Sequence, residues 1–234
     1  MPRTARADLG GYCYHVINRG NGRAEVFHKD EDYAAFGRLL RAGCARAPTR
    51  LLAYCLMPNH FHLLLWPRED GELGTWMQWL LTTHVRRYHK HYHSSGHVWQ
   101  GRFKAFPIQE DEHLLTVWRY VERNPRRAAL VSRAEDWPWS SLRFWRDPGK
   151  LPWLDPGPVP RPEHWLEVVH EPATEAELAR VRQSVERSQP YGGEVWVRQT
   201  AKTLGLEATL RPPGRPRKPV QDEAADAASV LLRE

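Results

Sequence analysis

Residues 57–66 restrict the fold more than any other stretch, because they predict a strand that carries two histidines on one face. The run His60-Phe61-His62 lies among apolar residues that favour strands. Side chains two positions apart in a strand point to the same face, so we expect His60 and His62 side by side and Phe61 in a core. Two neutral imidazoles on one face can share a divalent metal. Two histidines at this spacing also occur without a shared role, so the pattern alone leaves both interpretations open.

Alternating and helical spacings of apolar residues predict the elements around this strand. We expect strands at residues 12–17, 26–28, 51–56, 60–66 and 102–108, and helices at 30–47, 71–93 and 111–123. The strands at 51–56 and 60–66 lie close enough in sequence to form an antiparallel hairpin. This order predicts an α+β fold, a ferredoxin-like antiparallel sheet with helices on one face.

The composition changes after about residue 147. Residues 1–147 form the first predicted domain, and a concentration of prolines at 148–162 predicts a linker. Residues 163–210 predict a small helical C-terminal region, with helices at 173–186 and 196–204. Residues 211–234 begin with a basic, proline-rich run that includes Arg215 and Arg217. We expect this tail to be disordered until it meets an acidic partner such as DNA.

The net charge of +6 points to a polyanionic partner, nucleic acid before membrane, although a merely basic protein has the same charge. The three cysteines are an odd number without paired spacing, which fits a reducing compartment and neither a disulfide framework nor a zinc site. No apolar run of about 18 residues occurs, and no export signal precedes residue 10. We therefore expect a cytoplasmic protein, associated with the nucleoid when it is bound to DNA.

Several basic stretches are candidates for DNA contact. A turn over residues 18–23 contains two glycines between polar side chains and could hold a phosphate or a base edge, or be a plain hairpin turn. The end of the helix at 71–93 combines basic and aromatic residues, which suits phosphate contact and base stacking as well as a solvated helix end. The predicted DNA-binding residues are Asn18, Arg19, Asn21, Arg23, Arg86, Arg87, Arg102, Lys104, Arg126, Arg127, Arg215 and Arg217.

Tyr120 and Asn124 are four residues apart on one predicted helix and therefore share a face. Tyr120 lies outside the apolar stripe of that helix. A phenol is a poor nucleophile at neutral pH, but a metal beside a scissile phosphate can orient the phosphate and stabilise the developing charge. Tyr120 could also be an ordinary half-buried tyrosine, and Asn124 before Pro125 could be an ordinary helix end.

Five motifs in a fixed order resemble a known family. The chain resembles the REP-associated tyrosine transposases, host-carried relatives of the single-tyrosine HUH transposases, over roughly residues 10–145. The motifs are Tyr14-His15-Val16-Ile17-Asn18-Arg19-Gly20-Asn21, Met57-Pro58-Asn59-His60-Phe61-His62, Trp99-Gln100-Gly101-Arg102-Phe103, Arg119-Tyr120-Val121-Glu122-Arg123-Asn124-Pro125-Arg126-Arg127-Ala128 and Trp139-Ser140-Ser141. The C-terminal region and the tail also resemble an extension found in part of that family.

The resemblance implies that residues 1–147 are a catalytic domain that cleaves and rejoins single-stranded DNA. His60 and His62 would be the HUH pair, Tyr120 the nucleophile and Asn124 the third metal ligand, where many relatives carry Gln. Two imidazoles and an amide oxygen are compatible with Mg²⁺ or Mn²⁺. The substrate would be single-stranded DNA that forms palindromic hairpins, with a flanking tetranucleotide read near the turn at 18–23. A monomer is favoured over a homodimer.

Two other functions are compatible with the same residues. A DNA-hairpin-binding protein with vestigial catalysis would bind hairpins without cleaving them. An RNA phosphodiesterase that uses His60 and His62 directly as acid and base would keep its activity after Tyr120→Phe and would not require metal.

Overall fold

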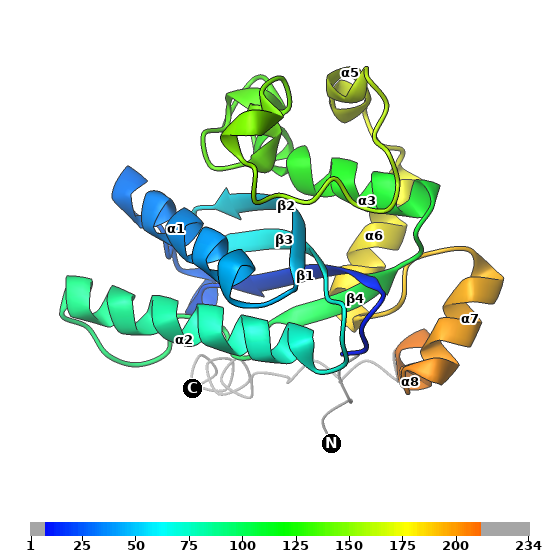
Figure 1. The fold of residues 1–234 in the computed structure, drawn as a ribbon, viewed down its shortest axis with the longest axis horizontal. Helices are drawn as coiled ribbons and strands as arrows, with labels where there is room; N and C mark the ends of the chain where they lie inside the picture. Colours follow the sequence, from blue (N-terminus) through cyan, green and yellow to red (C-terminus); the bar gives the residue numbers. More distant parts are fainter. Residues whose placement is uncertain (1–7, 212–234) are drawn as a thin grey trace, which may run out of the picture.

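The computed structural model describes residues 8–211 and contains one sheet of four antiparallel strands (Figure 1). The strands lie in the order β2-β3-β1-β4. Their bounds are β1 Cys13–Arg19, β2 Arg50–Met57, β3 His60–Trp66 and β4 Lys104–Ile108. The predicted hairpin is confirmed: β2 and β3 pair through a two-residue turn, with Met57 opposite His60.

The connections between these strands have the predicted ferredoxin-like order. Helix α1 (Asp30–Arg46) joins β1 to β2, and α2 (Glu72–Tyr92) joins β3 to β4. The first strand therefore lies in the centre of the sheet, between β3 and β4. The antiparallel α+β fold that the sequence predicts is confirmed.

Helices cover both faces of the sheet, whereas the sequence led us to expect helices on one face. α1 and α2 pack on the face that carries Phe61 and Leu63, as predicted. Helix α3 (Glu112–Glu122) packs on the opposite face, against Leu64 and Phe106. The strands are apolar on both faces, and each apolar face needs a layer of helices to cover it. His60 and His62 belong to the face that α3 covers, because they alternate with Phe61.

The segment after residue 147 packs against the sheet and α3. Residues 148–162, expected to be a linker, lie along β2: the backbone N–H of Asp155 donates to the carbonyl of Leu51 at 2.9 Å, and Trp153 stacks on Tyr54. Gly157 has a φ of +81°, and a Cβ there would lie 3.1 Å from the ring of Trp118. This close approach fixes the segment against α3.

The C-terminal helices share both cores of the molecule (Figure 1). They are preceded by the short α4 (Asn124–Arg127), and their bounds are α5 Trp165–His170, α6 Glu175–Arg187, α7 Glu194–Thr203 and α8 Glu207–Leu210. Trp165 and Val181 pack in the core beneath α3, whereas Ala201 packs in the core beneath α1 and α2. The predicted boundaries of the domains stay predictions.

A buried carboxylate joins α3 to this segment. Glu122 is fully buried, and its two oxygens accept hydrogen bonds from Ser141 Oγ at 3.0 Å and from Trp165 Nε1 at 2.7 Å. Arg161 lies 3.7 Å away, and burial raises the pKa of Glu122. The rings of Trp118 and Trp165 meet edge to face beside it. Each donor compensates part of the cost of burying the carboxylate.

Residues 26–28 are not the strand that was predicted. The backbone N–H groups of Val26 and Phe27 both donate to the carbonyl of Pro58, so they join the β2–β3 turn instead of a strand neighbour. Residues 212–234, which include the predicted contacts Arg215 and Arg217, lie outside the described residues. Among residues 8–211, no helix is long and apolar enough to span a membrane.

Candidate active site

The β2–β3 hairpin brings the two predicted histidines together at the start of β3. His60 lies opposite Arg19 of β1, and His62 lies opposite Ile17. Their ring centroids are 5.0 Å apart, with the rings at 80° to each other. His62 is buried, whereas His60 is half-buried at the end of the strand. The alternation of the strand therefore produces the predicted pair.

The turn that precedes β3 fixes the tautomer of His60. Asn59 Oδ1 accepts a hydrogen bond from His60 Nδ1 at 2.6 Å, while the amide nitrogen of Asn59 donates to the carbonyl of Arg23 at 3.1 Å. The proton of His60 is therefore on Nδ1, and Nε2 keeps a lone pair. Burial, with Arg19 and Arg127 nearby, lowers the pKa of His60 to about 4. His60 is thus a neutral imidazole at physiological pH.

A third histidine, which the sequence pattern does not assign to the site, lies beside His62 on the neighbouring strand. His15 of β1 is fully buried, and its Nε2 is 2.8 Å from Nδ1 of His62. Burial lowers the pKa of His15 to about 3 and that of His62 well below its usual range, with His60 adding to both effects. The only signal in the sequence is a lone histidine in an apolar strand, because the β1–β3 pairing that joins them is not local.

The structure tests whether a divalent metal fits this pair of histidines. Nε2 of His62 is buried and has no hydrogen-bond partner among residues 8–211. Nε2 of His60 keeps a lone pair, since its proton is on Nδ1. Two neutral imidazole nitrogens of this kind are suitable ligands for Mn²⁺ and acceptable ones for Mg²⁺. The donor set therefore fits the metal that the sequence motifs imply.

Helix α3 places Tyr120 over the histidines. The ring of Tyr120 stands at 87° to the ring of His62, with the centroids 5.8 Å apart, and at 82° to His15. Tyr120 is half-buried and packs against the core beneath α3. The structure thus brings Tyr120 and both predicted histidines to one place.

Asn124 lies one turn beyond Tyr120, but both ends of its amide are hydrogen-bonded within the helices. Its Nδ2 donates to the carbonyl of Tyr120 at 3.1 Å, and its Oδ1 accepts from Arg127 at 2.6 Å. Asn124 is buried. A metal ion bound to Asn124 Oδ1 would have to share this oxygen with Arg127 or displace the hydrogen bond from Arg127. The role of Asn124 as a ligand therefore stays a prediction.

A groove of about 580 Å³ passes beside Tyr120 and gathers part of the predicted DNA-binding set. Five of the predicted residues line it, namely Asn18, Arg19, Arg102, Lys104 and Arg127. Arg182 of α6 adds a further cation that the sequence analysis did not select, because nothing near it in sequence marks it. Five cations therefore surround one groove, with Glu186 as the acidic residue among its lining.

Other predicted DNA contacts lie away from this groove. Asn21 and Arg23 are exposed in the turn after β1, and Arg86 lines a second groove between α2 and residues 96–103, which Arg102 also reaches. Arg87 is half-buried on α2. Arg126 points toward α5, where it donates to Nδ1 of His170 at 2.6 Å.

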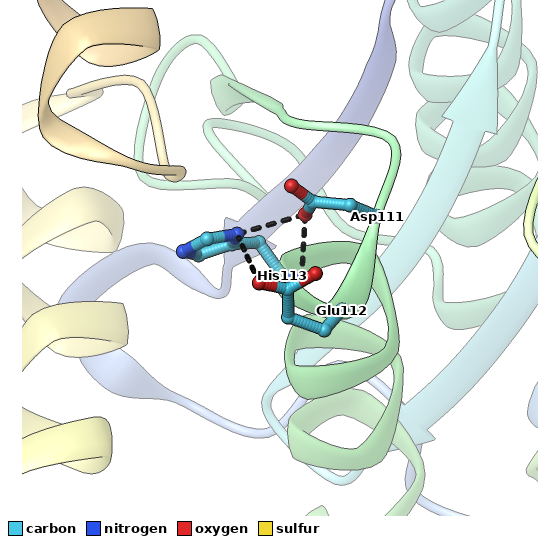
Figure 2. Close-up of side chains that lie close together, drawn as sticks. All are labelled: Asp111, Glu112 and His113. Atoms are coloured by element: carbon cyan, nitrogen blue, oxygen red, sulfur yellow. Dashed lines mark hydrogen bonds and ion pairs between the residues drawn. The ribbon is translucent and has the colours of Figure 1, made fainter.

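A different group of possible metal ligands lies at the other end of α3. Figure 2 shows Asp111, Glu112 and His113, whose ligand atoms lie within 4.8 Å of one another. Asp111 Oδ1 accepts from the backbone N–H of His113 at 2.8 Å and from its Nδ1 at 2.7 Å. This carboxylate is therefore the N-cap of α3. The capping role accounts for the arrangement without a metal.

Comparison with known proteins identifies the class of this fold and site. Residues 9–124 match the family described as "Transposase IS200 like". The resemblance to REP-associated tyrosine transposases is confirmed more closely by one relative. A protein of Haemophilus influenzae with that name is 32% identical over 115 residues, which cover 44% of this chain and 64% of the relative.

A solved structure has the same fold. The structure of a REP-associated tyrosine transposase bound to a REP hairpin matches with a TM-score of 0.51 and 17% sequence identity. The match covers 66% of this chain and 89% of that chain. At this identity the likeness concerns the fold, and the roles of individual residues depend on the geometry described above.

Proposed function

We propose that this protein is a metal-dependent endonuclease and strand-transferase that acts on single-stranded DNA at hairpin-forming repetitive palindromes. The observation that carries the proposal is the position of Tyr120, whose ring stands over His62 and lines the basic groove. A candidate nucleophile, a pair of candidate metal ligands and a candidate polyanion-binding surface thus lie together. The family that residues 9–124 match and the REP hairpin bound to the related structure support this substrate class.

His60 and His62 would hold a divalent metal, Mg²⁺ or Mn²⁺, through their Nε2 atoms, with Asn124 Oδ1 as the proposed third ligand. When bound, the metal would neutralise the non-bridging oxygens of the scissile phosphate and orient it. The carboxamide of Asn124 would reach this role after Arg127 releases its oxygen. The low pKa of His60, about 4, keeps that imidazole neutral and available as a ligand near pH 7.

Tyr120 would attack the phosphorus atom of the scissile phosphodiester through its phenolic oxygen. The new bond joins that oxygen to phosphorus, and the bond from phosphorus to the 3′ oxygen breaks. The proton lost by the phenol is balanced by the proton that the departing 3′ oxygen takes up. The products are a 5′-phosphotyrosine and a free 3′-OH. The covalent bond keeps the phosphodiester reactive, so a 3′-OH can later rejoin the strand.

The cations around Tyr120 would bind the DNA backbone. Arg19, Arg102, Lys104 and Arg182 line one groove with the nucleophile and would contact successive phosphates. The exposed turn at Asn21–Arg23 would read a short sequence beside the hairpin. We propose a monomer as the active form, with the homodimer as the alternative, and a cytoplasmic location where chromosomal DNA is accessible.

The experiment that tests this function is a cleavage assay with purified wild type and Tyr120→Phe. Both are incubated with labelled single-stranded hairpin DNA from the repeats that flank the protein's own gene, with Mn²⁺ or with EDTA. A denaturing protein gel then reveals covalent adducts. We expect a metal-dependent adduct in wild type and none in Tyr120→Phe. Tyr12→Phe, a tyrosine at the start of the sheet away from the histidines, is the matched control and should form the adduct.

Two outcomes favour the other functions. Tight hairpin binding by wild type without an adduct under any metal indicates a binding protein with vestigial catalysis. RNA cleavage that survives both Tyr120→Phe and EDTA indicates a phosphodiesterase in which the histidines act as acid and base.

A further inference from the structure

The contact between His15 and His62 requires one proton and one lone pair, and their placement decides which nitrogen of His62 is free. His15 Nε2 lies 2.8 Å from His62 Nδ1, and both side chains are buried. If His15 donates, the proton of His62 is on Nε2, which then cannot bind a metal. If His62 donates, its Nε2 carries the lone pair that a metal needs. The direction of one hydrogen bond therefore sets the chemistry of His62.

In His60 the proton is on Nδ1 and the lone pair is on Nε2, and the hydrogen bond to Asn59 imposes this arrangement. Asn59 Oδ1 can only accept, because the nitrogen of that amide donates to the carbonyl of Arg23. The proton of His60 is thus on Nδ1. His62 also uses Nδ1 for a partner within the protein, and its Nε2 is left without one among residues 8–211. The two histidines therefore share one pattern, in which Nδ1 is held by the protein.

We propose that His15 is a positioning residue, which accepts the Nδ1–H of His62 and so leaves Nε2 of His62 as a ligand for a divalent metal. This inference rests on the metal-dependent function proposed above. Histidine ligands commonly donate their other N–H to a polar partner, which fixes both the tautomer and the orientation of the ring. A bound cation would also give the buried Nε2 of His62 the partner that it lacks within the protein, whereas Nδ1 of His15, which then carries the proton of that ring, is buried and has no partner among residues 8–211.

Packing holds His15 in the orientation that this role needs. Its ring stacks on His62 with centroids 5.0 Å apart and a 28° angle between the planes. The ring of Phe106 lies 4.9 Å away, and Tyr120 stands edge-on at 6.2 Å. His15 belongs to β1, which is one of the two central strands of the sheet. The acceptor is therefore part of the rigid sheet rather than of a loop.

Binding of Mn²⁺ alone, without DNA, separates this role from catalysis. Isothermal titration of the full chain compares wild type, His15→Phe, His15→Gln and His84→Phe. We expect His15→Phe, which fills the space but cannot accept, to weaken Mn²⁺ affinity about 10- to 100-fold. His15→Gln, whose side-chain oxygen can accept, should recover most of the affinity. His84→Phe is the matched control, because His84 is another buried histidine, and should bind as wild type does.

The tautomer itself gives a second readout. Nitrogen-15 NMR of histidine in the Mg²⁺-loaded wild type should show His62 protonated at Nδ1, and His15→Phe should move the proton toward Nε2. Circular dichroism and thermal unfolding establish that each variant is folded. If His15→Phe fails to fold, His15→Gln and the wild-type tautomer still decide, because a proton on Nε2 of His62 in the loaded wild type would overturn the proposal.

The remaining outcomes are distinct from one another. Equal Mn²⁺ affinity in wild type and folded His15→Phe overturns the role of His15, as does an equal loss in His15→Gln and His15→Phe. Absence of any Mn²⁺ binding to wild type overturns both this role and the metal-dependent function. Metal binding that depends on His15, without a covalent DNA adduct, supports the positioning role and overturns the endonuclease.

Discussion

The guanidinium of Arg127 lies over the ring of Tyr120, 4.5 Å from the ring centroid, and its Nη2 donates to the phenolic oxygen at 3.3 Å. The same Nη2 donates to Asn124 Oδ1 at 2.6 Å. Arg127, which follows α3 in the chain, thus holds both the ring and the phenolic oxygen of Tyr120. The guanidinium is attracted to the face of the Tyr120 ring, and its hydrogen bond orients the phenolic oxygen.

Arg127→Ala should slow formation of the covalent DNA adduct by about 10- to 100-fold, because misplacing a nucleophile by about 1 Å can cost about 100-fold in rate. The measurement is single-turnover adduct formation with protein in excess over labelled hairpin DNA, so that weaker binding does not mask the chemical step. Arg126→Ala is the matched control, since Arg126 contacts His170 rather than Tyr120. Equal rates in the two variants would show that Arg127 does not position the phenol.

Charge removal in the groove should weaken DNA binding and its dependence on salt. Arg182→Gln should lower the slope of log affinity against log salt concentration by about 0.7 for single-stranded DNA, because one phosphate contact is lost. Fluorescence anisotropy with labelled hairpin DNA at several salt concentrations measures both quantities. Arg38→Gln, an exposed arginine on α1, should leave the slope unchanged. An unchanged slope for Arg182→Gln would remove α6 from the proposed DNA path.

Glu122→Ala should lower the free energy of unfolding by about 3 kcal/mol, because it leaves the donors of Trp165 and Ser141 and the charge of Arg161 without their shared acceptor. Glu122→Gln keeps the shape and one acceptor oxygen, so its loss should be smaller. Urea unfolding followed by tryptophan fluorescence measures both. The exposed Glu31 on α1 provides the control Glu31→Ala, and equal stability of Glu122→Ala and that control would contradict the prediction.

Acid should destabilise the protein partly through His84. Burial lowers the pKa of His84 to about 4, with Arg87 adding to the effect. The unfolded chain takes up a proton below about pH 6.5, whereas the native protein does so only near pH 4, so stability falls as the pH drops through this window. Between pH 7.5 and pH 5 the loss from this one group is about 2 kcal/mol.

His84→Phe removes this contribution, because Phe does not titrate and can occupy the space between Phe36 and Trp99. Urea unfolding at pH 7.5 and pH 5 should therefore show a loss that is smaller in the variant than in wild type by about 2 kcal/mol. The other buried histidines contribute equally to both proteins and cancel. Identical losses in the two proteins would show that His84 is not the group responsible.

The sequence predicts the elements of this fold because their signals are local. The helices α1, α2 and α3 follow apolar spacing, and the β2–β3 hairpin joins neighbours in the chain. The stretch 26–28 has the composition of a strand, but its N–H groups meet a single carbonyl at Pro58. Composition describes what a side chain prefers and does not say which backbone partner is within reach.

The candidate site likewise contains pairs of residues that are close in sequence, which can be predicted, and contacts made only by the tertiary fold, which cannot. His60 and His62 are paired by one strand, so their spacing predicts that pair. The prediction of one helix for Tyr120 and Asn124 is wrong, because α3 ends at Glu122 and Asn124 begins α4, but the two residues still lie one turn apart and are joined by a hydrogen bond. His15 reaches His62 only through the pairing of β1 with β3, and Arg182 reaches Tyr120 only because α6 folds back beside β4. Contacts of this kind depend on the tertiary fold, which no periodicity in the chain encodes directly.

The buried contact between α3 and the segment after residue 147 has an evolutionary consequence. A descendant that lost the segment through a frameshift would keep every residue of the histidine–tyrosine site. It would nevertheless expose Trp118 and leave the Glu122 carboxylate without the indole of Trp165. Loss of the segment and repair of that surface would have to occur together. Selection for a stable α3 is therefore enough to retain the C-terminal region, even in a lineage in which that region has no other function.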